Sequence, residues 1–419
     1  MVLNCIFGAL AGLSVVLLLW QWVAARRFPL HQRSAGLRSG TGKPPGITLL
    51  KPLKGADEFT EMCLRSWLTQ DYSGSVQVLF GVAAADDPAG AVVRKLLAEF
   101  PNADAQLVVC PEPLGTNAKV STLIQLERLA KHELICVSDA DVRVPVDFLA
   151  EAVVSLAAGT PASGPAASEH AGSETGAPKQ AALVNCFYRQ ANPTTLAMQC
   201  EAVAINADFW SQVLQSCSLK PMDFALGAAM LMRRADLAGS GGFAAIKDCL
   251  ADDYQLGNRI AKRGGRIELC PVVGECWNAP MGWVAVWKHQ LRWARTVRVC
   301  QPVPYFFSIL SNPTFWPALW VAVSFNRPAQ IFLGLALIVR LLVTADLQRR
   351  LGGKAESGKR KAEMSCPPPH VGGYGAGFWL APVKDLMQVA VWALAFIGNT
   401  IEWRGQRMRV RRDGTLISA

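Results

Sequence analysis

Two aspartates separated by one residue follow an apolar run and are the side chains in this chain best suited to hold a metal ion. The run 134–137 has no polar alternation, as expected for a strand buried on both faces, and Ser138, Asp139 and Asp141 follow it. The carboxyl ends of parallel strands open into the crevice where α/β sheets bind ligands. Carboxylate oxygens suit Mg²⁺ or Mn²⁺, which bind one or two carboxylates together with substrate phosphates. We therefore predict a metal–nucleotide site at Asp139 and Asp141; the alternative is a simple turn, since Asp is common after strands.

Basic and amide side chains at two other junctions are candidates for phosphate binding. Lys51 and Lys54 follow a short strand predicted at 47–50, where the alternative is a solvated turn. Asn117 and Lys119 lie in a Gly- and Asn-containing segment that opens a helix expected to run to about Lys131. A helix amino terminus favours anions through its free N–H groups and its dipole.

A further pair of acids, Asp252 and Asp253, stands at the start of another predicted helix, 251–259. Aspartate at a helix start is most often a cap that accepts hydrogen bonds from the first turn. The functional alternative is that one of the two carboxylates acts as a general base.

Composition and charge limit the classes of protein to which this chain can belong. The chain has 419 residues, 51% of them hydrophobic, and a formal net charge of +10. Its basic clusters flank apolar segments, which favours anionic lipid headgroups as the partner, and no nucleic-acid-binding module is recognisable. Twelve cysteines without a C-x-x-C pair and five scattered histidines give no disulfide framework or zinc pattern, which is typical of a reducing compartment.

Between apolar ends, the chain alternates strand and helix patterns, which predicts a mostly parallel sheet in an α/β domain at 47–282. Within this domain, 159–180 is rich in Ala, Gly, Ser and Pro and is expected to be a flexible insertion.

The amino-terminal segment 1–25 has no charged side chain and is long enough to span a bilayer. Trp20 and Trp22 lie where interfacial aromatics are expected, and Arg26 and Arg27 come after the apolar run. We predict a retained signal anchor with the amino terminus outside and the domain in the cytoplasm. A basic, Pro- and Gly-rich linker follows at 26–46.

The carboxyl-terminal region combines a basic amphipathic helix with apolar segments. Residues 283–300 carry tryptophans beside Lys and Arg, typical of an interfacial helix, although an ordinary surface helix is the alternative. The membrane region 301–400 holds three apolar segments, and a basic tail at 401–419 is expected in the cytoplasm. Three full crossings would put the basic groups after the second and third segments on opposite sides, against the positive-inside rule. We therefore expect one segment to be re-entrant or interfacial: either the first, broken by Asn312-Pro313 and Pro317, or the third, which carries Lys384 and Asp385.

Taken together, these residues resemble the ceramide glucosyltransferase family, inverting glycosyltransferases of the GT-A type (family 21), and within it the bacterial enzymes of hopanoid lipid synthesis. The resemblance covers nearly the whole chain, from the anchor to the tail. The motifs that carry it are Lys51-Pro-Leu-Lys-Gly55, Gly115-Thr-Asn-Ala-Lys119, Asp139 with Asp141, Ala251-Asp-Asp-Tyr254 and Arg292-Trp293.

Two departures from the family pattern concern the donor site. Ala84 or Ala85 stands where the first acidic motif usually begins, so the nucleotide role passes to Asp87 with reservation. His289 occupies the Gln/Arg position of the motif that ends in Arg292-Trp293; a histidine still donates a hydrogen bond, but its charge depends on pH.

The resemblance implies transfer of a hexose from a UDP-sugar to a lipid hydroxyl with inversion. Asp139 and Asp141 would hold the divalent cation, Asn117 and Lys119 would assist at the diphosphate, and Asp253 would be the base. Arg292 would contact the diphosphate and Trp293 would line the acceptor entrance, while Lys51, Lys54, Asp87, Asp252 and His289 complete the substrate site.

The acceptor would be ceramide or a hopanoid polyol, and the donor sugar would be glucose or N-acetylglucosamine. The protein would be a multi-pass protein of the bacterial inner membrane, in contact with the phospholipid bilayer. A processive polysaccharide synthase is one alternative, although it needs a longer membrane channel than this tail supplies. A catalytically silent membrane scaffold is another, favoured by Ala84 and Ala85.

Overall fold

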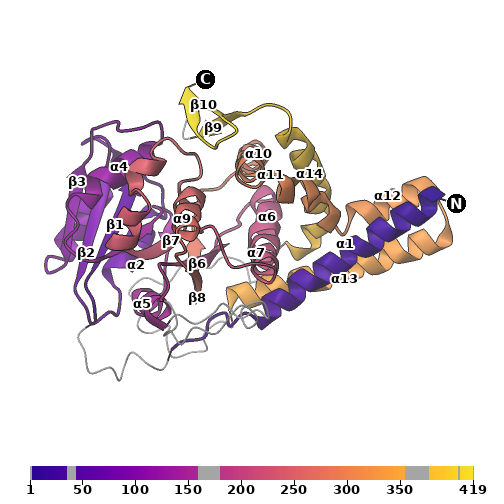
Figure 1. Ribbon diagram of the computed structural model, residues 1–419, viewed down its shortest axis with the longest axis horizontal. Coiled ribbons are helices and arrows are strands. Elements are labelled where there is room, and N and C mark those ends of the chain that lie inside the picture. Colours follow the sequence, from indigo (N-terminus) through magenta and orange to yellow (C-terminus); the bar gives the residue numbers. More distant parts are fainter. Residues whose placement is uncertain (1, 35–43, 159–179, 354–376, 404–405, 419) are drawn as a thin grey trace.

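A single mixed sheet lies at the centre of the globular domain (Figure 1). The computed structural model describes residues 2–34, 44–158, 180–353, 377–403 and 406–418, so most of the expected insertion 159–180 lies outside the described residues. The strand order is β3-β2-β1-β4-β7-β6-β8-β5. The strands are β1 (Ile47–Leu53), β2 (Val76–Val82), β3 (Asp104–Val109), β4 (Leu134–Ser138), β5 (Val142–Arg143), β6 (Leu183–Gln190), β7 (Ala229–Arg233) and β8 (Ile267–Cys276).

The amino-terminal half of the sheet has the parallel arrangement that the alternating pattern predicts. Strand β1 pairs in parallel with both β2 and β4, and β2 pairs in parallel with β3. Every residue of β1 and β4 is buried, as the unalternated apolar runs indicate. In the other half, β7 runs antiparallel to β4 and β6, whereas β6 and β8 are parallel. The prediction of an α/β domain is confirmed, with antiparallel β7 inserted at its middle.

Helices cover both faces of the sheet. One hydrophobic core joins the sheet to α2, α3 and α5, and another joins it to α4, η3, α7 and α9. The helices of the domain are α2 (Thr60–Leu68), α3 (Pro88–Glu99), α4 (Ala118–Glu127), α5 (Phe148–Ala158), α6 (Leu196–Val203), the π-helical turn η3 (Ala204–Phe209), α7 (Trp210–Cys217), α8 (Arg234–Gly239), the short helix η4 (Phe243–Ile246), α9 (Asp252–Lys262) and α10 (Trp283–Cys300).

Two expected boundaries differ from the structure. The first strand continues through Lys51 to Leu53, so Lys51 belongs to the sheet and not to a turn after it. The helix predicted to reach Lys131 ends at Glu127. The strand continues because Lys51, Pro52 and Leu53 still pair with Phe80, Gly81 and Val82 of β2.

The segment after residue 400, expected as a basic tail, folds into a small antiparallel sheet of β9 (Thr400–Trp403), β10 (Gln406–Val410) and β11 (Leu416–Ser418). Ile401, Met408, Val410 and Leu416 bury their side chains against Leu250. Two backbone hydrogen bonds fasten this sheet to the loop before α9: Leu250 N–H to the Gly414 carbonyl and Leu416 N–H to the Asp248 carbonyl. The sheet therefore supports the loop that leads into Asp252 and Asp253.

Three helices of the described residues are long and apolar enough to cross a membrane: α1 (Val2–Arg27), α13 (Arg327–Gly352) and 378–395, which contains η6 (Phe378–Leu380) and α14 (Ala381–Ala395). A fourth span is formed if the bent pair 302–311 and 315–324, inclined by 59°, counts as one. That pair comprises α11 (Pro302–Phe307), η5 (Ser308–Ser311) and α12 (Phe315–Ser324). The first apolar segment is thus broken where Asn312-Pro313 predicted a break.

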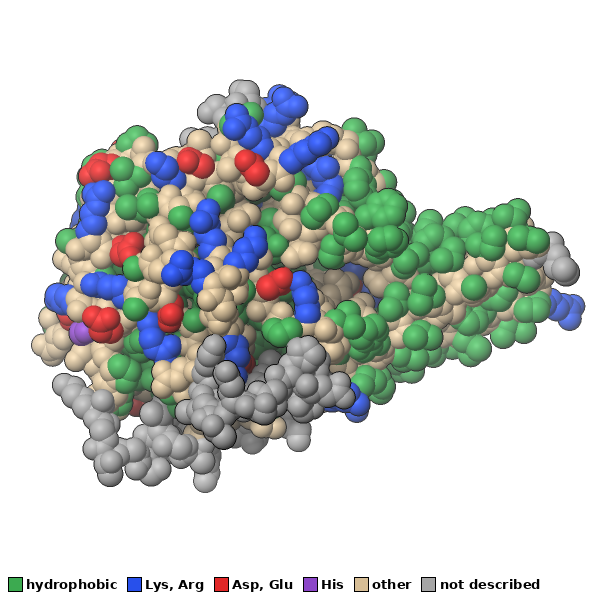
Figure 2. Space-filling model, viewed as in Figure 1, with side chains coloured by type: hydrophobic (Ala, Val, Ile, Leu, Met, Phe, Trp, Pro, Cys, Tyr) green, Lys and Arg blue, Asp and Glu red, His purple; other side chains and the backbone are tan. Residues whose placement is uncertain are grey.

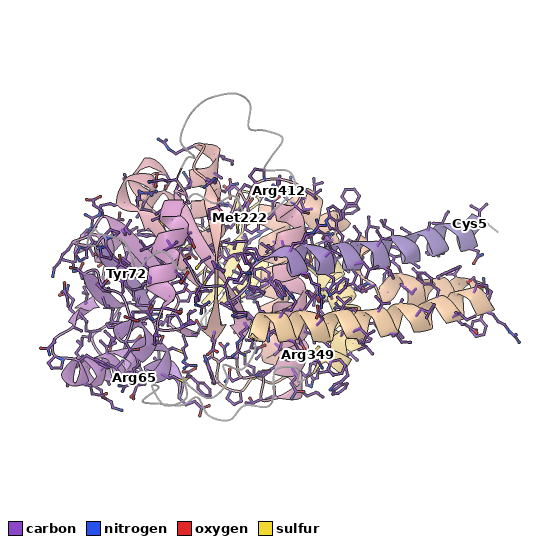
Figure 3. The ribbon with its side chains drawn as sticks, turned by 90° about the horizontal axis from the view of Figure 1, so that it is seen from below. Cys5, Arg65, Tyr72, Met222, Arg349 and Arg412 are labelled. Atoms are coloured by element: carbon purple, nitrogen blue, oxygen red, sulfur yellow. The ribbon has the colours of Figure 1, made fainter. Side chains whose placement is uncertain are left out.

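Helices α1, α12 and α13 extend together away from the domain, whereas α14 lies against the domain beside α10 and α11 (Figure 1). Hydrophobic side chains cover the projecting helices, and charged side chains are spread over the domain (Figure 2). Cys5 lies at the far end of α1, and Arg349 lies at the domain end of α13 (Figure 3). At the far end, Asn4 accepts hydrogen bonds from Trp320 and Asn326 and so joins the three helices.

The domain ends of α1 and α13 are part of the domain's core and not a flexible tether. Leu18 and Ala25 of α1 and Leu347 and Leu351 of α13 are buried in the same hydrophobic cluster as strand β4 and helix α4. The orientation of the domain relative to these helices is therefore fixed by packing.

A buried network of charges joins α13, η3 and α14. The Arg340 guanidinium binds both oxygens of Asp208 (2.8 and 2.9 Å) and both of Asp385 (2.7 and 3.0 Å). Lys384 also binds Asp208, and Thr314 donates to Asp385 at 2.6 Å. The Lys384–Asp385 pair in the third apolar segment thus has partners inside the protein, as buried charges require.

We expect replacement of Arg340 by methionine to lower the free energy of unfolding by about 3–5 kcal/mol, because it leaves two buried carboxylates with Lys384 as their remaining cation. The measurement is the thermal unfolding midpoint of the purified protein in detergent. Arg26→Met is the matched control, since Arg26 pairs with Asp346 while half-exposed and its loss should have little effect. Equal midpoints for the two variants would contradict the expectation.

Candidate active site

The buried ammonium of Lys119 joins two of the predicted acids. Lys119 lies in the first turn of α4, Asp139 directly follows β4, and Asp252 begins α9. The Lys119 Nζ lies 2.7 Å from Asp139 Oδ1 and 2.8 Å from Asp252 Oδ2. The structure thus brings together side chains that are more than a hundred residues apart in sequence, at the carboxyl end of β4.

Electrostatics keep Lys119 charged. Burial works against the ammonium, but Asp139, Asp252 and Asp253 outweigh that effect and hold the pKa of Lys119 above its ordinary value. A permanent positive charge beside partly open carboxylates suits an anionic ligand such as a diphosphate.

Asp253 is the carboxylate in this group whose protonation is most altered. Burial raises the pKa of Asp253 to about 6, the charge of Asp252 adds to the rise, and Lys119 opposes it. One of its oxygens accepts the backbone N–H of Tyr254 at 2.7 Å. Its other oxygen lies only 2.7 Å from where a Cβ on Gly227 would stand, so Gly227 leaves the room that this carboxylate occupies. A carboxylate with a pKa near 6 is suited to general base catalysis.

Lys51 lies within strand β1, is not exposed to solvent and contacts the turn that carries Asp139. Its side chain is fully buried, and its ammonium donates to the Asp139 carbonyl and, at 3.2 Å, to Ser138 Oγ. Burial lowers the pKa of Lys51 to about 8, although the nearby acids counteract this in part. The alternative of a solvated turn is therefore wrong for Lys51. In this arrangement Lys51 positions the residue that carries the Asp139 carboxylate instead of reaching a phosphate.

Asn117 and Asp87 both have structural partners. Asn117 is buried, caps α4 by accepting the N–H of Val120 at 3.2 Å, and donates to the Cys249 carbonyl at 2.8 Å. Asp87 caps α3 through Ala89 N–H and accepts the N–H of Gly55 at 2.9 Å, which ties the start of α3 to the loop after β1. Lys54, next to Gly55, is exposed. The predicted substrate contacts of these residues remain predictions.

The turn after β4 carries Asp139 and Asp141, the two aspartates predicted to hold a divalent cation. Backbone bonds shape this turn: Val142 N–H donates to the Asp139 carbonyl at 3.3 Å, and Trp277 N–H donates to the Asp141 carbonyl at 3.0 Å. The Asp139 side chain is 38% exposed. Among the described residues, no group of three or more His, Cys, Asp or Glu is arranged to hold a metal ion. Carboxylates are the ligand type that Mg²⁺ or Mn²⁺ takes together with water and substrate phosphates, and one oxygen of Asp139 is bound by Lys119 here, so the metal role of Asp139 and Asp141 stays a prediction.

On α10, His289 and Gln290 face Glu201 of α6. The His289 Nδ1 lies 2.7 Å from Glu201 Oε1, and Gln290 donates to the same oxygen at 2.8 Å. The His289 ring packs edge-on against Trp293, with ring centroids 4.8 Å apart. Arg292 lies half-buried on the same helix.

A row of aromatic rings runs from α10 to β6. Trp293 lies 6.2 Å from Phe209 of η3, and Phe209 lies 5.5 Å from Tyr188 at the end of β6. Burial raises the pKa of Tyr188 well above its usual value, with further contributions from Cys276 and from the charges of Asp253, Asp139 and Asp141. Tyr188 therefore lies within range of the charges of these acids, and the row of rings leads from it to His289.

Sequence analysis did not identify Glu201, Tyr188 or Gly227. Glu201 carried a usable signal, because it is one of only two acids, with Asp208, in the apolar segment 193–217, and acids in apolar segments are usually functional or paired. Tyr188 and Gly227 have no local signal, since they matter only because of what lies next to them in the fold.

The sequence profile of glycosyl transferase family 21 matches residues 6–416, and the chain belongs to this family. It is 32% identical over 122 residues to a ceramide glucosyltransferase of Candida albicans, a match that covers 26% of this chain and 22% of the relative. It is 22% identical over 380 residues to ceramide glucosyltransferase 3 of Caenorhabditis elegans, covering 89% and 74%. The first of these matches spans less than a quarter of the relative's length.

Solved structures of glycosyltransferases are similar at a lower level. The mannosyltransferase PcManGT from Pyrobaculum calidifontis, in complex with GDP-Man and Mn²⁺, is 19% identical with a TM-score of 0.48, covering 93% of this chain and 99% of that one. A glucosyl-3-phosphoglycerate synthase from Mycobacterium tuberculosis is 15% identical with a TM-score of 0.37, covering 65% of this chain and 85% of that one.

We expect Asn117→Ala to lower the free energy of unfolding by about 1–3 kcal/mol, because it removes a helix cap and leaves the Cys249 carbonyl without its donor. Thermal unfolding of the purified protein measures this. Asn102→Ala, an exposed asparagine, serves as the control and should leave the midpoint unchanged. An unchanged midpoint for Asn117→Ala would mean that its contacts contribute nothing to stability.

Proposed function

We propose that this chain transfers a hexose from a UDP-sugar to a lipid hydroxyl at the membrane surface, with inversion at the anomeric carbon. The observation that carries the proposal is the group formed by Lys119, Asp139 and Asp252, with Asp253 beside it. The pKa of Asp253 is raised to about 6. Membership of family 21 and relatives named ceramide glucosyltransferases support it.

The proposed reaction needs one base and one stabilised leaving group. The acceptor hydroxyl oxygen forms a bond to the anomeric carbon from the face opposite UDP, and its proton passes to the Asp253 carboxylate. The bond from the anomeric carbon to the diphosphate oxygen breaks, and UDP leaves with the electron pair. Lys119 stabilises the charge that develops on the diphosphate, with Arg292 as a second cation on α10.

Asp139 and Asp141 are the residues that would hold a divalent cation, Mg²⁺ or Mn²⁺. When bound, such an ion supplies positive charge next to the diphosphate. Lys51 keeps the Asp139 backbone in place from inside the sheet.

A membrane location with the domain in the cytoplasm fits the arrangement of charges. Arg26 and Arg27 end α1, and Arg349 and Arg350 lie in the last turn of α13, where both helices meet the domain. Basic residues concentrate on the cytoplasmic side of membrane proteins. If α1, α12 and α13 enter the bilayer and α14 stays at its surface against α10, the basic groups after α13 and after α14 fall on one side. This arrangement removes the conflict that three full crossings create.

The acceptor we favour is ceramide, because the relatives are named ceramide glucosyltransferases. A hopanoid polyol as acceptor, N-acetylglucosamine as donor sugar and a bacterial inner membrane remain predictions. The intact acids argue against a catalytically silent scaffold, despite Ala84 and Ala85.

The first test is Asp253→Asn, which we expect to reduce glucose transfer from UDP-glucose to ceramide by about 10²–10⁴-fold, because it removes the base. Retained UDP binding would show that the donor site is intact. The matched control is Asp104→Asn, since Asp104 is an exposed acid paired with Lys131 on the surface and should have no effect on transfer. Full sugar transfer by Asp253→Asn would refute the assignment of Asp253 as the base. If the wild type neither transferred sugar nor released UDP, the hypothesis of a catalytically silent scaffold would be favoured.

The second test is the pH dependence of kcat/KM. A base acts in its deprotonated form, so activity should be constant above about pH 7 and fall as pH drops through about 6, where Asp253 gains its proton. UDP binding measured over the same range is the control for effects on the donor site. A profile that stays flat to pH 5 would contradict the raised pKa of the base.

A further inference from the structure

The small carboxyl-terminal sheet has one buried face and one charged face. Along β10, apolar side chains that pack against Leu250 alternate with Arg407 and Arg409, which are exposed. This alternation follows from the geometry of a strand, in which successive side chains point to opposite faces. Arg411 and Arg412 directly follow β10 and are exposed as well. We call these four exposed arginines the basic face.

Nearby acids do not balance the charge of the basic face. Within the described part of the chain, none of its arginines forms an ion pair with a carboxylate. The segment 400–418 contains two acids, Glu402 and Asp413. Glu402 is already paired with Lys288 of α10 at 2.8 Å, and Asp413 accepts the N–H of Thr415 at 3.0 Å. The small sheet therefore carries an excess of positive charge.

Helix α10 adds to this positive charge. The guanidinium groups of Arg295 and Arg298 donate to carbonyl and amide oxygens of the segment 397–400, which joins α14 to β9. These acceptors are neutral, so the two bonds hold the segment in place without cancelling either charge. The summed field of such a group of cations attracts anions.

The basic face lies next to exposed apolar side chains. Strand β9 begins five residues after α14 ends, so at most about 17 Å of chain separates the two elements. Phe396 and Ile397 in this connection are exposed, and Phe396 lies 6.3 Å from Phe306 of α11, which is also exposed. Figure 2 shows Lys and Arg side chains over the small sheet, next to hydrophobic side chains that continue toward the projecting helices. Apolar side chains bordered by arginines are typical of a surface that lies at a membrane interface.

The small sheet is also connected to the candidate active site. It binds the loop 247–250 through the two backbone hydrogen bonds described above. Two carbonyls of the same loop accept hydrogen bonds from Asn117, at 2.9 and 2.8 Å. Asn117 caps the helix that carries Lys119, and the loop leads into Asp252. The loop therefore links the small sheet to both ends of the Lys119–Asp252 ion pair.

We propose that the basic face binds the anionic headgroups of the bilayer that holds the membrane helices, and that this contact stabilises the loop 247–250. Guanidinium groups bind phosphate oxygens through two parallel hydrogen bonds, which suits the headgroups of anionic phospholipids. A surface that binds only the folded small sheet shifts its equilibrium away from local opening. The composition of the bilayer thus acts on the elements that position Lys119 and Asp252.

The experiment measures backbone hydrogen exchange in the full-length protein, reconstituted in nanodiscs of phosphatidylcholine alone or of an equimolar mixture with phosphatidylglycerol. The amides to follow are those of Leu250 and Leu416, which bond the loop to the small sheet. We expect both to exchange about fivefold more slowly, or slower still, in the anionic nanodiscs. Each arginine near an anionic surface contributes enough for roughly a fivefold change in such an equilibrium.

The test variant combines Arg407→Gln with Arg409→Gln, and it should lose the difference between the two kinds of nanodisc. The matched control combines Arg94→Gln with Arg128→Gln, which removes the same charge from exposed arginines of α3 and of the end of α4. The control should keep the difference. Thermal unfolding midpoints in neutral nanodiscs test that both variants are folded.

Equal exchange in neutral and anionic nanodiscs for the wild type would overturn the inference. An equal loss of the difference in the test and control variants would also overturn it, because total charge and not the basic face would then be responsible. The difference should shrink as salt is added, since salt screens exposed charges. A difference that salt leaves unchanged would contradict binding by charge.

Inorganic phosphate added to the protein in neutral nanodiscs separates a bilayer from a soluble anion. Phosphate that slowed exchange as much as the anionic nanodiscs do would show a site for soluble anions and would overturn the assignment to the bilayer. No effect of phosphate, together with slower exchange in anionic nanodiscs, would support it. These measurements need neither a sugar donor nor an acceptor, so their outcome is independent of the proposed sugar transfer.

Discussion

The candidate site depends on one buried cation. Lys119 at the start of α4 holds Asp139 after β4 and Asp252 at the start of α9, at 2.7 and 2.8 Å. A buried ammonium is tolerated only with its partners in place, and two carboxylates brought close together need a cation between them. The three elements that meet here therefore stabilise one another's positions, and Lys51 fixes the same turn from the sheet side by binding the Asp139 carbonyl. Two lysines from different elements thus set where the acids stand.

Where local pattern decided the structure, the sequence was sufficient. The unalternated run 134–137 predicts a buried strand, and it is one. Lys51 was misjudged because a charged residue before a proline looks like the end of a strand, and its burial depends on acceptors that the end of the neighbouring strand supplies, the Asp139 carbonyl and Ser138 Oγ. In the segment after residue 400, Met408 and Val410 alternate with arginines, a period of two that indicates a strand. The many arginines concealed that signal, and burial against Leu250 reveals it.

The site was predictable in part for the same reason. Lys119, Asp139, Asp252 and Asp253 stand in short motifs at strand ends and helix starts, and the fold brings them together. Glu201 and the cluster of Arg340 with Asp208, Asp385 and Lys384 depend on contacts between helices far apart in sequence, which no short motif encodes. The π-helical turn η3 belongs to this second group: it carries both Asp208, which faces Arg340, and Phe209, which faces Trp293. The same turn therefore connects α13 with the row of rings between α10 and β6, and π-helical turns are frequent at functional sites.

The small sheet of β9, β10 and β11 has a consequence for how the protein is made. Its residues follow α13 and α14 in the chain, yet Gly414 and Leu416 supply backbone partners to the loop that leads into Asp252. Domains fold progressively as a chain is synthesised, beginning from the amino terminus. The ribosome therefore releases the helices of the anchor before it releases the strands that brace this loop. A chain released only as far as α14 thus carries every candidate membrane helix of the described residues, but it lacks the strands that brace the loop before Asp252 and Asp253.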